Sequence, residues 1–314
     1  MQSKFEEFEE FNELPAQTKI ETAQNLSNRD LLNLAQTSRS HSLLFKPVID
    51  VRKLLHHVTR GEHDAVKAML KKDTRLIFKR GVVTDCSGRA FDNISGFEYA
   101  LWALDKHMWA MMLECIDQDE EGRKVFEQLI VQYDKVNKNG VTYKLNGNTI
   151  TEQHFDFKNS IIKELQMQID SINAHGTKDW DAIEKQWREG VGGAQKKFPI
   201  HVVDEYCSDQ TFSPVPKFTS QPESSKQFYN WTTGNEENWF GLDSKLGGDF
   251  AIYKGLGCDW RSCVGEVRAA VLVCAVDLGA MVALCEIRTN DFINLKSRLG
   301  ELMTVDKQPQ IYQM

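Results

Sequence analysis

Apolar residues recur at helical spacing near the start of the chain, between Phe11 and Phe45. Most lie three to five positions apart: Ile20, Ala23, Leu26, Leu31, Leu34 and Ala35. The pattern breaks once, at Ser27-Asn28, where either side chain can cap a second helix. Pro15 suits the first turn of the first helix, where its missing N–H would have no intrahelical acceptor. With a third short helix after His41, the pattern predicts three helices that need a neighbour or a partner to bury their apolar faces.

A joint is expected at Pro47, followed by two further helical stripes. The first covers residues 51–58 and stops before Gly61, and the second covers residues 62–72. A weaker copy of this pair starts at residues 85–89 and continues through residues 99–101 to Met112, and residues 77–94 read as an inserted loop. A longer helix is predicted from Val125 to Val136.

The middle of the chain shows a hairpin signal and then two helices. Asn146-Gly147 between alternating residues 141–150 predicts a tight turn with positive φ. One helix is expected over residues 156–174, and Asp179 begins another that carries Trp180, Ile183 and Trp187 on one face. We expect this second helix to end in the glycine cluster at residues 190–193.

The last part of the chain, residues 198–314, is rich in Pro and Gly turns and predicts an irregular α+β domain packed on the helical part. Strands are expected at residues 200–203 and 250–253, and a helix at residues 292–299 that Thr289 or Asn290 caps and Gly300 ends. The apolar run 267–287 has Asp277 at its centre, which argues against a membrane span. Two buried strands hinged at residues 277–279, or one buried helix, explain it better.

Composition narrows the class of protein. The 314 residues are 41% hydrophobic and 26% charged, as in ordinary globular proteins. The net charge of −7 disfavours nucleic acid as a partner, because phosphate binding needs a basic face. Seven scattered cysteines form no disulfide framework, and no secretory leader is expected, so we predict a cytoplasmic protein.

The best candidate for catalysis is Cys207, paired with His201 or His154 and oriented by Asp204 or Asp209. An enzyme would also show a concave site around Cys207 or Asp249 that contains a titrating group with a perturbed pKa. Metal ligands are not expected, because Cys258 and Cys263 lack a second pair and His56 and His63 lack partners; no cofactor is expected either. The glycines at positions 247, 248, 255 and 257 match no phosphate-loop motif and are expected to form turns.

The N-terminal stretch resembles an F-box. The matching positions are Leu14, Pro15, Ile20, Leu26, Asp30-Leu31, Leu34 and Phe45. The chain departs from the motif at Thr37-Ser38-Arg39, where the family usually has Val-Cys before the basic residue. The resemblance implies docking to a Skp-type adaptor of a cullin–RING ubiquitin ligase. The residues implied in this contact are Leu14, Pro15, Ile20, Leu26, Leu31 and Leu34.

The two helix pairs resemble degenerate ankyrin repeats, although the Thr-Pro-Leu-His signature is missing. The combination resembles effectors that intracellular bacteria secrete into the host cytosol. The expected fold is a mainly α N-terminal part, with F-box-like helices and ankyrin-like helix pairs, followed by an irregular α+β C-terminal domain. The expected division is 1–48, 49–136, 137–193 and 194–314.

The resemblance implies a non-catalytic adaptor that links an unidentified host protein to the ligase. Two alternatives remain. In one, the protein is an interaction scaffold whose F-box-like helices only cap the structure. In the other, the C-terminal domain is a cysteine-dependent enzyme. An exposed apolar patch that includes Leu14, Ile20 and Leu31 would favour the adaptor.

Overall fold

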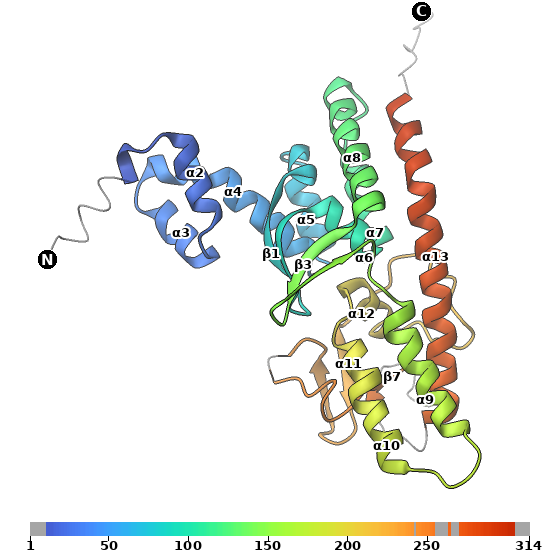
Figure 1. The fold of residues 1–314 in the computed structure, drawn as a ribbon. Coiled ribbons are helices and arrows are strands. Elements are labelled where there is room, and N and C mark those ends of the chain that lie inside the picture. Colours follow the sequence, from blue (N-terminus) through green and yellow to red (C-terminus); the bar gives the residue numbers. More distant parts are fainter. Residues whose placement is uncertain (1–10, 242, 255–262, 265–269, 305–314) are drawn as a thin grey trace, which may run out of the picture.

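The protein is mixed α/β and mostly helical, with two small sheets (Figure 1). The computed structural model describes residues 11–241, 243–254, 263–264 and 270–304. The N-terminal helices project from one side of the body, and the long C-terminal helix runs along the opposite side. This confirms a mostly helical protein with β structure, but two strands, β1 and β2, lie within the part that was expected to be mainly α.

Three helices form at the N-terminus as predicted, but the third is much longer than expected. They are α2 (Ala16–Gln24), α3 (Asn28–Gln36) and α4 (Arg39–Val58). The predicted joint at Pro47 is wrong, because α4 continues through this residue for 20 residues in all. Pro47 removes one helical hydrogen bond, but Phe45 on one side and Val51 on the other are anchored in packed cores.

Both predicted helix pairs form. α4 and α5 (His63–Leu70) make the first, and α6 (Gly96–Ala103) and α7 (Lys106–Glu114) make the second. α4 packs against α6, and α5 packs against α7. No repeat was identified in the described part of the chain, so the ankyrin-like interpretation stays a prediction. The predicted loop at residues 77–94 is wrong: it overlaps η1 (Thr74–Phe78) and contains strands β1 (Arg80–Thr84) and β2 (Ala90–Ser95).

The first sheet is antiparallel, with strand order β1-β2-β3-β4. Strands β3 (Val141–Leu145) and β4 (Asn148–Glu152) form the predicted hairpin. Its turn residues Asn146 and Gly147 have φ of 50° and 80°, which Asn and Gly tolerate best. α8 (Glu120–Asn139) packs against α6 and against the C-terminal helix.

A helical hairpin follows the sheet. Its first arm is the π-helical segment η2 (Lys158–Ile162) with α9 (Lys163–Asn173). Its second arm is α10 (Trp180–Lys185), the π-helical segment η3 (Gln186–Val191) and α11 (Gly192–Gln195). The Asp179 side chain caps the start of this arm, as predicted.

The prediction that this arm ends in the glycine cluster is wrong, because the arm continues to Gln195. Gly192 lies where a Cβ would come within 2.5 Å of the Phe250 carbonyl oxygen, so the lack of a side chain at this position allows close packing.

The segment predicted as a strand at residues 200–203 is helix α12 (Ile200–Tyr206). Every side chain of α12 is buried, so polar and apolar residues carry no periodic signal there. Pro199 immediately precedes the helix, a position at which its missing N–H removes no intrahelical bond.

The second sheet has strand order β6-β5-β8-β7. The strands are β5 (Gln227–Asn230), β6 (Asn235–Asn238), β7 (Ile252–Tyr253) and β8 (Cys263–Val264). β5 and β8 are parallel and the other pairs are antiparallel. β7 confirms the expected strand near residue 252, although it is shorter than predicted.

One helix, α13 (Ala270–Thr304), accounts for the described part of the apolar run and for the predicted last helix. The prediction of a separate helix over residues 292–299 is therefore wrong, and Gly300 does not end α13. The Asp277 carboxylate is buried and accepts a hydrogen bond from the Lys254 backbone N–H at 3.2 Å. Among the described helices, none is long and apolar enough to cross a membrane.

The buried side chains form two separate clusters. The larger cluster, here the main core, runs from Val51 to Leu299 and joins both sheets to the surrounding helices. The smaller cluster is confined to α2, α3 and the first half of α4. The N-terminal helices therefore have a core of their own, and α4 is the element that both clusters share.

Candidate partner-binding surface

The N-terminal module, defined here as residues 11–48, is shaped by local capping bonds. The Ser27 hydroxyl accepts a hydrogen bond from the Asp30 backbone N–H at 3.1 Å and so begins α3. The Ser38 hydroxyl accepts one from the His41 backbone N–H at 3.0 Å and begins α4. Each cap satisfies a helical donor that would otherwise lack a partner, so the two turns are fixed by short-range chemistry.

Four buried side chains form the centre of the module: Ala23, Leu31, Ala35 and Phe45. The His41 ring is also buried, between Phe11 and Phe45, at centroid distances of 5.9 and 5.6 Å. The Thr37 hydroxyl lies 2.7 Å from the His41 Nδ1 atom. This core is small for three helices, which leaves other apolar side chains of the module partly exposed.

Arg52 on α4 fastens the turn between α2 and α3. Its guanidinium group is buried and donates to four acceptors at 2.8 to 3.4 Å, namely the carbonyl oxygens of Ala23, Gln24 and Leu26 and the Asn28 side chain. Burial lowers the pKa of Arg52. Because the acceptors include the last carbonyls of α2, this one side chain both caps α2 and fixes the module on α4.

The six residues predicted to bind a partner differ in exposure. Leu14 is 38% exposed, and Pro15 is also exposed. Ile20, Leu26 and Leu34 are partly buried. Leu31 is only 1% exposed, so the expectation that it contributes to an open patch is wrong. Its side chain packs in the small core because it faces Ala23, Ala35 and Phe45 there.

Sequence reasoning missed two exposed leucines as candidate site residues. Leu32 on α3 is 42% exposed, and Leu43 on α4 is 67% exposed. Each stands beside another apolar residue, Leu31 and Leu44 respectively. Adjacent helical residues point about 100° apart, so both members of such a pair seldom face one small core. The two adjacent leucine pairs were therefore the sequence signal that one leucine of each pair would be exposed.

The structure does not assemble the predicted cysteine–histidine pair. Cys207 is buried, and burial raises the pKa of its thiol, which disfavours the nucleophilic thiolate. His201 lies six residues earlier on the same helical segment, about 240° away around its axis. The His201 Nε2 atom lies 2.6 Å from the Ala103 carbonyl oxygen instead.

The other proposed histidine partner of Cys207, His154, also packs elsewhere. The His154 ring packs on Phe292 at a centroid distance of 4.3 Å, and burial lowers its pKa to about 4. Asp204 is buried, whereas Asp209 is exposed. Among the described residues, neither His201 nor His154 hydrogen-bonds to Cys207.

A buried charged network surrounds α12. The Arg288 guanidinium of α13 lies 3.2 Å from the Glu205 carboxylate, 2.8 Å from the His107 Nε2 atom and 3.0 Å from the Phe218 carbonyl oxygen. The Lys254 ammonium donates to the carbonyl oxygens of Glu205 and Ser208, both at 2.6 Å. Burial raises the pKa of Glu205 to about 7 and lowers that of Lys254 to about 8. These groups satisfy one another, so the network holds α7, α12 and α13 together.

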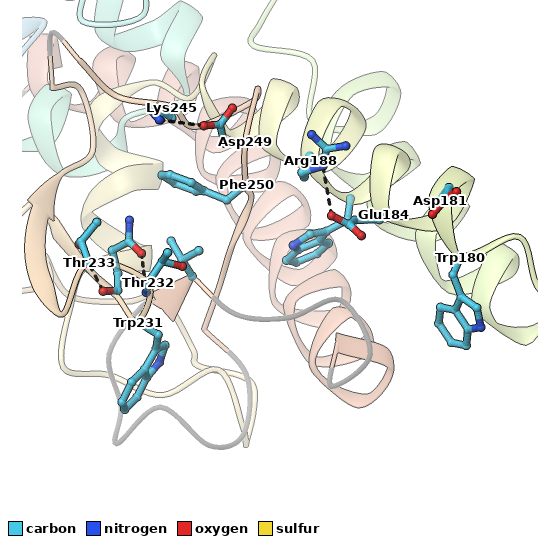
Figure 2. A pocket seen from close by; sticks show the side chains of 13 residues that line it. Trp180, Asp181, Glu184, Arg188, Trp231, Thr232, Thr233, Lys245, Asp249 and Phe250 are labelled. Carbon is cyan, nitrogen blue, oxygen red and sulfur yellow. Dashed lines mark hydrogen bonds and ion pairs between the residues drawn. The ribbon is translucent and has the colours of Figure 1, made fainter.

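A concave site lies beside Asp249, which is one part of what the enzyme alternative expected. The cavity has a volume of about 840 Å³. Figure 2 shows Trp180 and Trp231 on its opposite sides and Phe250 on its wall. The Asp249 carboxylate is largely exposed and pairs with the Lys245 ammonium at 3.1 Å. An exposed, paired carboxylate lacks the buried environment that tunes a general base.

Within the described ranges, no three His, Cys, Asp or Glu side chains are grouped to hold a metal ion. His56 and His63 therefore complete no metal site in this part of the chain. Cys258 and the glycines at 255 and 257 lie outside the described residues, as does the Cys263 side chain. Gly247 has φ of 78° and forms a turn, as expected.

Comparison with known proteins identifies a relative and a domain family. The family described as the CBUA0006 C-terminal domain matches residues 160–299. A Coxiella burnetii (strain RSA 493 / Nine Mile phase I) protein named "Uncharacterized protein CBUA0006" is 37% identical over 265 residues, which covers 77% of this chain and 73% of the relative. No match was found among solved structures. The identity and coverage place the present chain in the same family as CBUA0006.

Proposed function

We propose that this protein is a bacterial effector that acts in the host cytosol as a non-catalytic adaptor. In this proposal the N-terminal module docks a Skp-type adaptor through Leu14, Pro15, Ile20, Leu26 and Leu34. Leu31 supports that face from the small core. The remaining body presents an unidentified host protein to the ubiquitin ligase.

The separate core of the module is the observation that carries this proposal. A helical cap would be expected to share the core of the domain it covers, whereas this module has its own buried cluster and projects from the body (Figure 1). Leu14 and Pro15 are exposed at its start, and Leu32 and Leu43 add exposed apolar surface. Apolar side chains left open on a small module are typical of docking surfaces.

The relationship to a Coxiella burnetii protein supports a bacterial origin of the family. The enzyme alternative has weaker support, because its cysteine is buried and its histidines are engaged elsewhere. An adaptor needs only two binding surfaces and no reactive group.

The test is a binding assay between the purified full-length protein and a Skp-type adaptor. The wild type is compared with a Leu14→Ala/Pro15→Ala variant and with a Val131→Ala/Ile293→Ala variant. The control pair is equally suited to truncation, because Val131 and Ile293 are exposed by 62% and 60% on the body. We expect binding at about micromolar Kd or tighter for the wild type and the control, and a loss of at least roughly tenfold for the Leu14/Pro15 variant.

Circular dichroism and thermal unfolding of each variant show whether it stays folded. No detectable binding of the wild type would reduce the module to a structural cap. Equal loss of affinity in both variants would also argue against the proposed surface, because the effect would not be specific to the module.

A further inference from the structure

The cavity beside Asp249 is lined by aromatic side chains from three separate parts of the chain, and we call it the tryptophan cavity. The second helical arm supplies Trp180 and Trp187, the turn after β5 supplies Trp231, and the segment before β7 supplies Phe250. Single apolar residues on a surface are ordinary, whereas aromatic rings gathered around one cavity indicate a binding site. The volume of about 840 Å³ suits a small ligand.

The most exposed of these rings, Trp231, is held in place by its own turn. The Asn230 Oδ1 atom accepts a hydrogen bond from the Thr232 backbone N–H at 2.9 Å, and the Asn230 side-chain amide donates to the Glu237 carboxylate at 2.9 Å. The Tyr229 ring meets the Trp231 ring edge to face, with centroids 4.7 Å apart. Trp231 is nevertheless 60% exposed, so a fixed turn presents its indole to the solvent. A ligand that stacks on a fixed ring loses little affinity to ordering it.

The charged groups of the lining largely compensate one another. The Arg188 guanidinium pairs with the Glu184 carboxylate at 3.6 Å, and the Lys245 ammonium pairs with the Asp249 carboxylate at 3.1 Å (Figure 2). Asp181 is the one charged lining residue outside these two pairs. A strongly charged ligand would therefore find few free counter-charges, and the lining favours a neutral one.

The strands that reach the cavity offer no open edge to a peptide. Asn230 of β5 and Val264 of β8 line it, and these two residues pair with each other. Both strands are inner strands of the described order β6-β5-β8-β7. Strand addition needs an edge with unpaired N–H and C=O groups, so this mode of peptide binding is disfavoured here.

Polar groups accompany the aromatic rings. Thr232 and Thr233 bring hydroxyl groups to the lining, and Asp181 brings a carboxylate. Trp187 is 1% exposed, and its indole N–H has no acceptor in the described part of the chain. Neutral hydroxyl groups can both donate to and accept from such partners. A sugar ring combines these hydroxyl groups at its edge with an apolar C–H face that packs on an indole.

We propose that the tryptophan cavity binds a neutral linear oligosaccharide. Trp180 and Trp231, which lie on opposite sides of the cavity (Figure 2), stack on different sugar rings of one chain, and the polar lining groups bind hydroxyl groups between them. This inference goes beyond the adaptor proposal and does not depend on it. No residue of the N-terminal module lines the cavity, so sugar binding and adaptor binding can fail separately.

Isothermal titration calorimetry of the full-length protein tests the ligand class. The probes are three neutral hexasaccharides (cellohexaose, maltohexaose and N-acetylated chitohexaose) and two charged ones (de-acetylated chitohexaose and hexagalacturonate). We expect at least one neutral hexasaccharide to bind with a Kd below about 1 mM. It should bind at least roughly tenfold more tightly than both charged probes and than its own disaccharide, which is too short to stack on both tryptophans. Its affinity should stay the same between about 50 mM and about 500 mM salt, because no ion pair is formed with a neutral ligand.

The role of the two exposed rings has its own test. Trp180→Ala and Trp231→Ala should each weaken binding of the hexasaccharide by at least roughly tenfold, and Trp231→Phe should retain more affinity than Trp231→Ala. Met167→Ala and Val215→Ala are matched controls, because these side chains are 43% and 47% exposed and do not line the cavity. Both controls should bind as the wild type does, and circular dichroism checks that every variant is folded.

Three results would overturn the proposal. The first is a Kd above about 1 mM for every neutral hexasaccharide. The second is tighter binding of a charged hexasaccharide than of any neutral one. The third is an equal loss of affinity in the tryptophan variants and the controls, which would place the sugar outside the cavity.

Discussion

At the scale of single residues, burial governs the chemistry of the polar side chains around α12. His201 is fully enclosed, and its Nε2–H group donates to the Ala103 carbonyl oxygen, while its Nδ1 atom has no partner among the described residues. Burial lowers its pKa to about 4. A neutral imidazole can satisfy this site with one donor, whereas an imidazolium would place an unpaired charge in the core.

The free energy of unfolding should therefore depend on pH through His201. The folded pKa is lower than the ordinary value of 6.5, so the stability contribution is complete above 6.5 and is lost as pH falls through about 4. Urea unfolding should show that the wild type loses roughly 3 kcal/mol more than His201→Gln between these pH values. Asp204 and Glu205, with pKa values raised by burial, change stability in the opposite direction in both proteins. Parallel curves for the two proteins would contradict the prediction.

At the scale of elements, two glycines of the second helical arm have unequal roles. A Cβ on Gly192 would lie 2.5 Å from the Phe250 carbonyl oxygen and 3.0 Å from the Gly247 nitrogen, both backbone atoms that cannot move independently. A Cβ on Gly193 would meet nothing within 4 Å. The arm can approach residues 247–250 only because position 192 lacks a side chain.

Alanine substitution should separate these two positions. Gly192→Ala should lower the free energy of unfolding by about 1 to 3 kcal/mol, because the contact must open. Gly193→Ala should be neutral or stabilise by about 0.4 to 1 kcal/mol, since alanine favours the helix and restricts the unfolded chain. Chemical denaturation of both variants checks this. A similar loss in both would show that the close approach is not the cause.

Short-range chemistry was readable from the sequence, and long-range packing was not. Ser27, Asp179 and Asn146-Gly147 act within a few residues of themselves, and the structure places each as predicted. α12 was misassigned because its neighbours bury it on all sides, which removes the alternation that distinguishes helix from strand. In the candidate surface, exposed Leu14 followed from the motif, but buried Leu31 depends on how three helices meet.

At the scale of the whole molecule, the protein has two cores of unequal size joined through α4. The main core includes both sheets and most helices, whereas the module has four fully buried apolar residues. Local stability follows the amount of buried apolar contact. The module should therefore open more readily than the body while remaining folded most of the time.

Native-state hydrogen exchange should reveal this difference. We expect amides in α2 and α3 to be at least roughly tenfold less protected than those in the middle of α8 and α13. Arg52→Leu should reduce protection further in α2 and α3, because their turn loses its four hydrogen bonds, and leave α8 unchanged. Lys53→Leu, at the exposed neighbouring position, is the control. Uniform loss of protection across both parts would show that they unfold as one unit.

Because α4 continues as one helix through Pro47, the number of residues in this helix fixes the orientation of the module relative to the body. Each residue inserted between Pro47 and Val51 would rotate the module by about 100° about the α4 axis and move it by about 1.5 Å. One inserted residue would thus turn Leu14 and Pro15 to another side of the molecule, whereas seven would nearly restore their heading at a greater distance. The number of residues in one helix therefore sets both the orientation of the module and its distance from the body. Insertions or deletions in α4 would change both in steps of one residue.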